Sequence, residues 1–251
     1  YQAASRRLNE GGVFVQFLQA YEVDNQTVAT VLATVRSAFD HVEVWQTLPV
    51  DLQLVCSNEP LRYTADDLRE RVDSPVVKRA VERVWMTPGV EGFLSHFAAN
   101  AGWVDHVAGL PNVEINTDDR TILEYRFAKT VGQPTGFSVD GARAMLAQEG
   151  WHRPTIDDNA VDWRRVELMR QLSNLINRGP LSAAMLTQPE DQALLRALEM
   201  VRVGDYGAAL AAWPEAYAEP EIPVLRLVLS HCMAEQAKQE CLDLVAPLAE
   251  S

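Results

Sequence analysis

The first 40 residues pair an apolar run of strand length with an apolar pattern of helical period. Residues 13–19, which follow Gly11-Gly12, are rich in branched and aromatic side chains and have the length of a strand buried on both faces. Residues 27–39 place apolar side chains about 3.6 positions apart, which predicts a helix whose N-cap is Asp24 or Asn25. This pattern predicts a central strand followed by a helix.

The next segment has the pattern of a hairpin. Residues 41–46 alternate apolar and polar positions, and residues 52–57 resume a β-rich run after a turn that contains Pro49. Together with the preceding strand and helix, these runs predict an α/β fold: the back half of a doubly wound sheet, about three strands within residues 1–63, with the last strand antiparallel.

From residue 64 onward the apolar spacing is helical. Pro75 suits the first position of a helix. Expected helices cover residues 65–72, 76–85, 139–149 and 161–177, with short helices through 92–107 and an ordered element at 121–130. The second part of the chain is therefore expected to be all-α.

The last third contains a unit of two apolar-faced helices. In residues 193–213 the stretch Gly204 to Leu210 joins them and resembles a tetratricopeptide repeat, with further helices expected at 224–237 and 239–249. The expected organisation is a sheet domain with a helical extension (residues 1–63 and 64–132), a helical linker region (133–180) and a repeat-like tail (181–251). Because at most one and a half repeats are visible, the tail is expected to pack on the preceding part or to continue further.

The amino-acid composition limits the classes of partner that the chain is expected to bind. The net charge of −13 and the absence of a long basic run argue against nucleic acid and anionic membranes, while a cationic partner is tolerated. The three cysteines and five histidines are not spaced like metal ligands, so no metal is expected. No stretch approaches the roughly 20 apolar residues of a membrane span.

Two sequence blocks resemble the spermidine-synthase-like family, which has the class I methyltransferase fold. The first runs from Tyr1 to Thr47 and includes Arg-Leu-Asn-Glu-Gly-Gly-Val-Phe-Val-Gln at 7–16 and His-Val-Glu-Val-Trp-Gln-Thr at 41–47. The second, Asn-Thr-Asp-Asp-Arg-Thr-Ile-Leu-Glu-Tyr at 116–125, is similar to the family's C-terminal signature. Within the family the chain is closest to large bacterial proteins in which this domain follows membrane helices.

The resemblance implies transfer of an aminopropyl group from decarboxylated S-adenosylmethionine to an amine such as a polyamine. It also implies that the glycine-rich cofactor loop, the acidic ribose-binding residue and the catalytic aspartate precede Tyr1. We therefore expect a fragment of a longer, cytoplasmic or membrane-anchored parent. The parent would bind decarboxylated S-adenosylmethionine or S-adenosylmethionine, whereas this chain would bind no cofactor and would be inactive alone.

Six residues are candidates for the amine site. Gln16, Gln19 and Tyr21 lie at and beyond the carboxyl end of the first strand, where open α/β sheets present residues to ligands. The alternative is that the two glutamines pair with loops and Tyr21 covers the core.

Asp118, Asp119 and Arg120 complete the candidate set. The two carboxylates suit an ammonium group, and Arg120 could fix one of them. The alternative is that Asn116 or Thr117 caps a helix whose N-terminus Asp118 and Asp119 favour. Glu124 is expected to face solvent rather than this site.

A protein-interaction module is the rival function. In that case residues 181–251 would bind a protein partner, and a concave groove lined by Tyr206, Trp213 and Tyr217 would favour it. A catalytic pair of His41 and Cys56 has no support, because nothing in the sequence supplies the third, orienting group.

Overall fold

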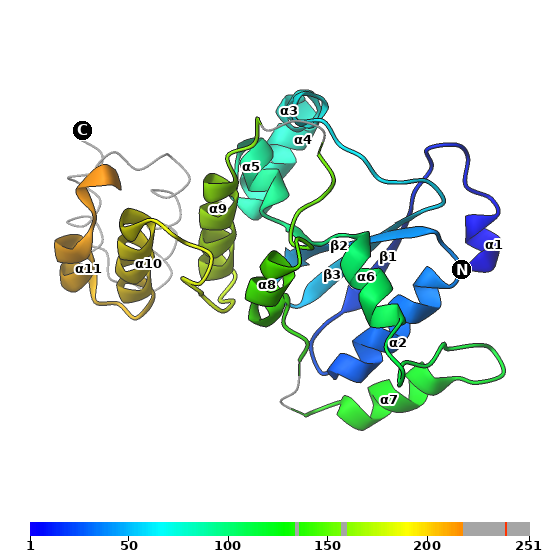
Figure 1. The fold of residues 1–251 in the computed structure, drawn as a ribbon. Coiled ribbons are helices and arrows are strands. Elements are labelled where there is room, and N and C mark those ends of the chain that lie inside the picture. Colours follow the sequence, from blue (N-terminus) through cyan, green and yellow to red (C-terminus); the bar gives the residue numbers. More distant parts are fainter. Residues whose placement is uncertain (134–135, 157–159, 218–238, 240–251) are drawn as a thin grey trace. The chain divides into compact units, whose positions relative to one another are not determined.

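The computed structural model describes residues 1–133, 136–156, 160–217 and 239. Within these residues the chain has mixed α/β structure and separates into two compact units (Figure 1). Unit 1 is built from residues 1–67 and 96–159, and unit 2 from residues 68–95 and 160 onward. The α/β class is thus confirmed, but the division differs from the expected ranges, because residues 68–95 join the C-terminal helices and not the sheet.

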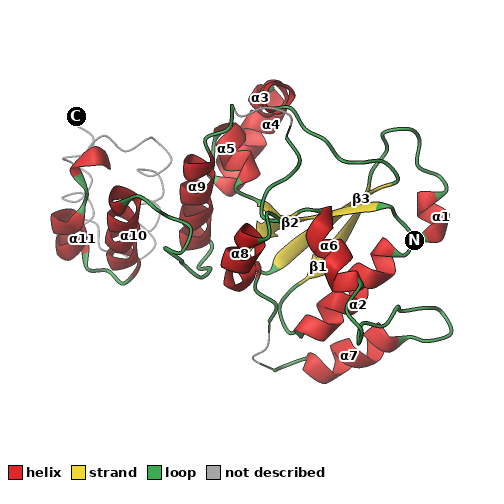
Figure 2. Cartoon of the chain, viewed as in Figure 1, coloured by secondary structure: helices red, strands yellow, loops and turns green. Residues whose placement is uncertain are grey.

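Unit 1 is organised around one sheet. Its strands are β1 (Phe14–Gln19), β2 (His41–Leu48), β3 (Asp51–Ser57) and β4 (Phe97–Ala99), arranged in the order β1-β3-β2-β4 (Figure 2). Each neighbouring pair is antiparallel. Consequently β1 and β2 run parallel to each other on either side of β3, and the last strand of the expected three is antiparallel, as predicted.

The expected hairpin is β2 and β3, which turn at Pro49 and Val50. Two other expectations for the sheet are wrong. Residues 97–99 form β4 instead of a helix, because this short buried run pairs with the outer edge of β2. β1 is not central among the described strands: it ends the sheet, and Val15 and Phe17 are each 50% exposed.

Helices cover one face of this sheet. Helices α2 (Asn25–Arg36) and α6 (Ala101–Ala108) pack against β2, and α8 (Val139–Gln148) packs against β4. Helix α7 (Ile122–Thr130) lies beside α2, and the short α1 (Gln2–Ser5) is at the N-terminus. The carboxylate of Asp24 accepts the Thr27 N–H at 2.6 Å, which confirms Asp24 as the N-cap of α2. Val44, Leu54 and Cys56 point from the sheet into the core beneath these helices. The core of unit 1 is therefore the space between the helices and one sheet face.

Unit 2 is helical. It contains α3 (Ala65–Asp73, which begins at the end of unit 1), α4 (Pro75–Ala80), the π-helical turn η1 (Val81–Trp85), α5 (Gly89–Leu94), α9 (Trp163–Ile176), α10 (Pro189–Arg202), α11 (Tyr206–Ala212) and the 3-10 turn η2 (Glu215–Tyr217). Most of α9 is buried, and its Arg164 makes two hydrogen bonds of 2.7 and 2.8 Å to the fully buried Asp191 of α10. This bidentate pair joins α9 to α10.

Helices α10 and α11 form the expected helix pair. Gly204 ends the first helix with φ +82°, a conformation that favours glycine, and Asp205 caps the second by accepting the Ala208 N–H. Tyr206 is 4% exposed and packs in the core of unit 2. The helices expected at 224–237 and at 239–249 lie outside the described residues, apart from position 239. The repeat-like character of the tail therefore remains a prediction.

Candidate functional site

Strand β2 sends two different sets of side chains to the two faces of the sheet. Val42 and Val44 enter the core under the helices. Because successive side chains of a strand alternate in direction, Glu43 points to the opposite face, as do its neighbours two positions away, His41 and Trp45. Glu43 is 3% exposed, so a carboxyl group is buried on the face that the helices leave uncovered.

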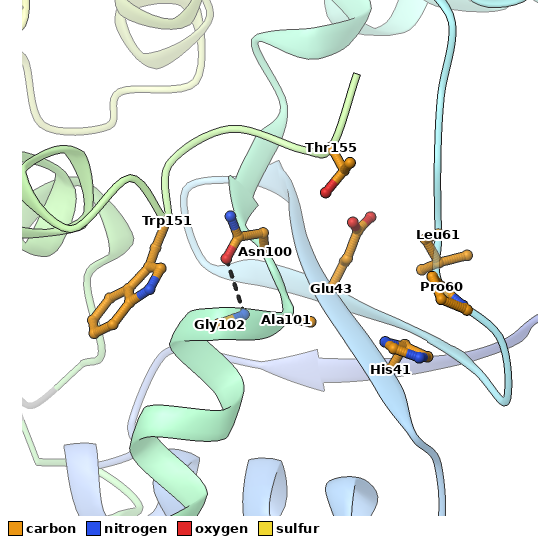
Figure 3. A pocket seen from close by; sticks show the side chains of 9 residues that line it. All are labelled: His41, Glu43, Pro60, Leu61, Asn100, Ala101, Gly102, Trp151 and Thr155. Atoms are coloured by element: carbon orange, nitrogen blue, oxygen red, sulfur yellow. Dashed lines mark hydrogen bonds between the residues drawn. The ribbon is translucent and has the colours of Figure 1, made fainter. Parts of the chain in front are cut away.

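A cavity of about 370 Å³ lies beside Glu43 (Figure 3). It is lined by His41, Glu43, Pro60, Leu61, Asn100, Ala101, Gly102, Trp151 and Thr155. These residues come from β2, from the segment after β3, from the start of α6 and from the segment after α8, all within unit 1. Four separate parts of unit 1 thus converge on this space.

Two aromatic side chains, Tyr63 and Trp45, lie against Glu43. The Tyr63 hydroxyl donates a hydrogen bond to the Glu43 Oε2 at 2.8 Å, and the Trp45 indole lies close to the same carboxyl group. Burial raises the pKa of Glu43 to about 7, although the Tyr63 hydrogen bond and the nearby Trp45 indole oppose the shift. Burial also raises the pKa of Tyr63, and the nearby Glu43 carboxylate raises it further. Glu43 can therefore gain or lose a proton near neutral pH.

Backbone contacts fix the segments that cover Glu43. The Tyr63 N–H donates to the Thr155 carbonyl at 3.0 Å, and Tyr63 forms a parallel bridge with Ile156. The rings of Trp45 and Phe97 meet edge to face, with centroids 5.1 Å apart and planes at 87°. Two segments far apart in the sequence, at Tyr63 and at Thr155, thus close over this end of the sheet face.

Asn100 ties the opposite wall together. Its Oδ1 accepts the Gly102 N–H at 3.0 Å and so caps α6, while its Nδ2 donates to the carbonyls of Gly150 and Arg153. A Cβ added to Gly102 would lie 2.9 Å from the Trp151 indole, so glycine permits this close approach. The side chain of Asn100 is therefore occupied by the protein itself, and this wall presents mainly apolar surface to the cavity.

This arrangement can do two things chemically. A carboxyl group that titrates near neutrality can exchange a proton with a bound molecule, and an ionised carboxylate in an apolar cavity attracts a cation. Across the part of the chain that the structure describes, no three His, Cys, Asp or Glu side chains gather as metal ligands.

The first group of sequence candidates lies at β1. Gln16 and Gln19 are three positions apart and project to opposite sides of the strand. Gln16 donates to the Phe17 carbonyl at 2.6 Å and receives the Tyr1 hydroxyl at 3.3 Å, and Gln19 donates to the Tyr21 carbonyl at 3.4 Å. Tyr21 is 46% exposed. Both glutamines thus make local contacts, as the alternative hypothesis expects, but Tyr21 does not cover the core.

The second group lies in an exposed turn. Thr117 and Arg120 exchange backbone hydrogen bonds of 3.2 and 3.0 Å, which places Asp118 and Asp119 at the tip of the turn in solvent. Arg120 forms an ion pair with Glu114. The Asn116 side chain accepts the Leu123 N–H at 3.0 Å near the start of α7. Asn116 thus supports the start of α7, but the N-cap of that helix is Thr121 and its first turn does not contain Asp118 or Asp119, so the alternative that Asn116 or Thr117 is the N-cap is wrong.

The structure does not bring the two groups together. The Asn116 N–H donates to the Thr34 hydroxyl in the last part of α2, whereas Gln19 and Tyr21 precede the first residue of that helix. A 12-residue helix is about 18 Å long. The acidic turn and the end of β1 therefore lie at opposite ends of α2 and do not share one pocket.

The structure also bears on the proposed pair of His41 and Cys56 and on one residue of the rival groove. Val42 pairs with Cys56 and points with it into the core, so His41 lies on the other face of the sheet and cannot contact Cys56. Burial raises the pKa of the Cys56 thiol to about 12. Tyr206 is buried in the core of unit 2, so its side chain does not line the concave groove that the protein-interaction hypothesis expects.

Glu43 was not among the sequence candidates. It stands between Val42 and Val44 in a strand whose apolar-polar alternation indicates a polar side in solvent. An acidic residue flanked by valines and followed by a tryptophan was the available signal. Its burial depends on Tyr63 and Thr155, which come from distant positions.

Comparisons of the chain with protein-family models, with curated proteins and with solved structures found no match. Among the described helices, none combines the length and the apolar character needed to span a bilayer.

Proposed function

We propose that unit 1 is part of a spermidine-synthase-like transferase, which moves an aminopropyl group from decarboxylated S-adenosylmethionine to an amine. In this proposal the nucleoside-binding strands lie next to β1 and this chain supplies the neighbouring part of the sheet. The residue blocks at 7–16, 41–47 and 116–125 carry the resemblance on which the proposal rests.

The direction of the strands is the observation that supports it best. β1, α2 and β2 make a parallel strand-helix-strand crossover, and β3 is inserted antiparallel between the two strands. Parallel crossovers are the building unit of doubly wound sheets, in which helices cover both faces. This arrangement agrees with the sheet portion that the resemblance implies.

The surface of β1 gives a second support. Val15 and Phe17 on one face of β1, and Val13 just before the strand, are each about half exposed, and among the described strands only β3 pairs with β1. An open edge beside an apolar face is a place where a further strand and a covering helix can pack. A doubly wound sheet that continues past β1 would use both.

Calorimetric titration with S-adenosylmethionine, methylthioadenosine and spermidine tests the proposal. We expect the nucleosides and the amine to bind a protein extended upstream of Tyr1 through the implied cofactor strands, and the nucleosides not to bind the present chain. Replacing Asp118 and Asp119 by asparagine should weaken spermidine binding to the extended protein if the acidic turn contributes to the amine site. The proposal fails if the extended protein binds none of the three compounds.

A further inference from the structure

We propose that the cavity beside Glu43 is a binding site for a small primary alkylammonium ion, with the Glu43 carboxylate accepting hydrogen bonds from the ammonium group. The Glu43 side chain is on the sheet face opposite α2, and the cavity is separate from Gln16, Gln19, Tyr21 and the acidic turn. It does not depend on the transferase proposal.

The lining of the cavity carries one acidic side chain and no lysine or arginine. Glu43 is that acidic side chain among the nine lining residues. The hydrogen bond that the structure gives Glu43 comes from the neutral Tyr63, and the neutral Trp45 indole lies nearby. When ionised, a buried carboxylate that lacks a cationic neighbour is stabilised strongly by a ligand that brings a positive charge.

The walls favour an alkyl group on that cation. Pro60, Leu61, Ala101 and Trp151 present apolar surface, and the side chain of Asn100 is occupied by its own three hydrogen bonds. The aromatic face of Trp151 can also attract a cation. A volume of about 370 Å³ suits a small organic molecule. One charged anchor and several apolar walls match an ammonium head with a short alkyl chain.

A metal ion fits these residues less well. Divalent cations generally require several oxygen, nitrogen or sulfur ligands, and no such group of three acidic, histidine or cysteine side chains occurs in the described ranges. An ammonium ion requires only a few hydrogen-bond acceptors. Glu43 provides these, with the Thr155 hydroxyl at the rim as a further polar group.

Binding at this site should be linked to a proton. The free carboxyl of Glu43 has its pKa raised to about 7, so below that pH it must release a proton before it can hold an ammonium ion. Affinity should therefore fall about tenfold for each pH unit below about 7. Tyr63 and His41 are the other titratable groups that face Glu43 or line the cavity. Since histidine generally changes charge between pH 5 and 8, a His41→Asn variant shows how much of the pH dependence of binding comes from His41.

The test is an NMR titration of the full chain with n-butylamine hydrochloride at pH 8, followed through amide and indole signals. n-Butanol serves as the neutral analogue of the probe. The test variant is Glu43→Gln, which keeps the size of the side chain and removes its charge. The matched control is Glu124→Gln, the same change at an exposed position on α7.

We expect n-butylamine to shift signals of Trp151 and Gly102 equally in the unmodified chain and in Glu124→Gln. In Glu43→Gln the affinity should fall by at least tenfold, and the pH dependence between 6 and 8 should persist in His41→Asn. An Ala101→Phe variant, which fills the cavity and retains Glu43, should also lose binding. The proposal is overturned if the unmodified chain shows no saturable shifts, if n-butanol binds as well as the amine, or if Glu43→Gln binds with unchanged affinity.

Discussion

The two ends of the same sheet face differ sharply in how they are covered. Across the strands, Phe17 of β1, Gln53 of β3 and Trp45 of β2 form one row, because Phe17 pairs with Gln53 and Gln53 with Trp45. Trp45 is 8% exposed, whereas Phe17 is 50% exposed. One large aromatic side chain in this row is buried and the other lies in solvent, although both stand on neighbouring parts of one surface.

The difference comes from the covering segments and not from the strands. Tyr63 and the segment at Thr155 lie over the β2 end and bury Trp45 and Glu43, while no described segment lies over Val15 and Phe17. The covered end gains a cavity and a carboxyl group that titrates near neutrality. The open end keeps an apolar strand edge. Residues with similar local patterns thus acquire different properties through distant segments.

The largest effect on stability is expected from truncating the buried aromatic residue of this row, compared with truncating the exposed one. Trp45→Ala should lower the free energy of unfolding by about 3–5 kcal/mol, because it leaves a cavity among Phe97 and Tyr63. Phe17→Ala, at the open end, should cost less than about 1 kcal/mol. Denaturant unfolding of both variants measures the difference. Equal losses would show that β1 is as well covered as β2.

Glu43 makes the covered end sensitive to pH. Its folded-state pKa of about 7 lies above the ordinary value of 4.5, so between these pH values the folded state keeps a proton that the unfolded state has released. The free energy of unfolding should therefore fall as the pH rises from about 4.5 to 7 and change no further with this group above about 7, a total of roughly 3 kcal/mol.

Glu43→Gln removes this dependence. The free energy of unfolding of the variant minus that of the unmodified chain should be larger at pH 8 than at pH 4.5, by roughly 3 kcal/mol. Urea unfolding at the two pH values gives the difference, and Glu124→Gln provides the control because its side chain is exposed. If the difference for Glu43→Gln matches that of the control, Glu43 is not the buried carboxyl group described above.

The smallest effects are expected at the acidic turn, which like Phe17 lies in solvent. Asn116→Ala removes the hydrogen bond to the Leu123 N–H and should cost about 1 kcal/mol. Asp118→Asn in the same segment should change stability by less than about 0.5 kcal/mol, because its side chain is exposed. Thermal unfolding of the two variants compares them. A larger loss for Asp118→Asn would mean that the turn packs against other residues.

Local patterns predicted the elements better than their surroundings. The hairpin, the Asp24 cap of α2 and the helix pair at Gly204 follow from side-chain period and turn residues, and all three are present. β4 escaped prediction because a three-residue strand has too few positions to show a period. The place of β1 in the sheet was also misjudged, since an apolar run indicates burial without naming the segment that would bury it.

The candidate site depended on long-range contacts in the same way. Glu43 is buried by residues about 20 and 110 positions further along the chain, namely Tyr63 and Thr155. No periodic pattern connects positions so far apart. The candidates chosen from sequence were instead polar residues near a strand end and in a turn, and they are exposed or engaged in local hydrogen bonds.

The most direct test of the central claim is the titration of Glu43 itself, followed by NMR of side-chain carboxyl carbons with and without saturating n-butylamine. Glu43→Gln identifies the signal. Glu43 should titrate with a pKa near 7 in the free chain, and this pKa should drop when the amine is bound, because the ammonium group stabilises the carboxylate. A free pKa near 4.5, or a pKa that saturating amine leaves unchanged, would contradict the assignment of this cavity as a site for a cationic ligand.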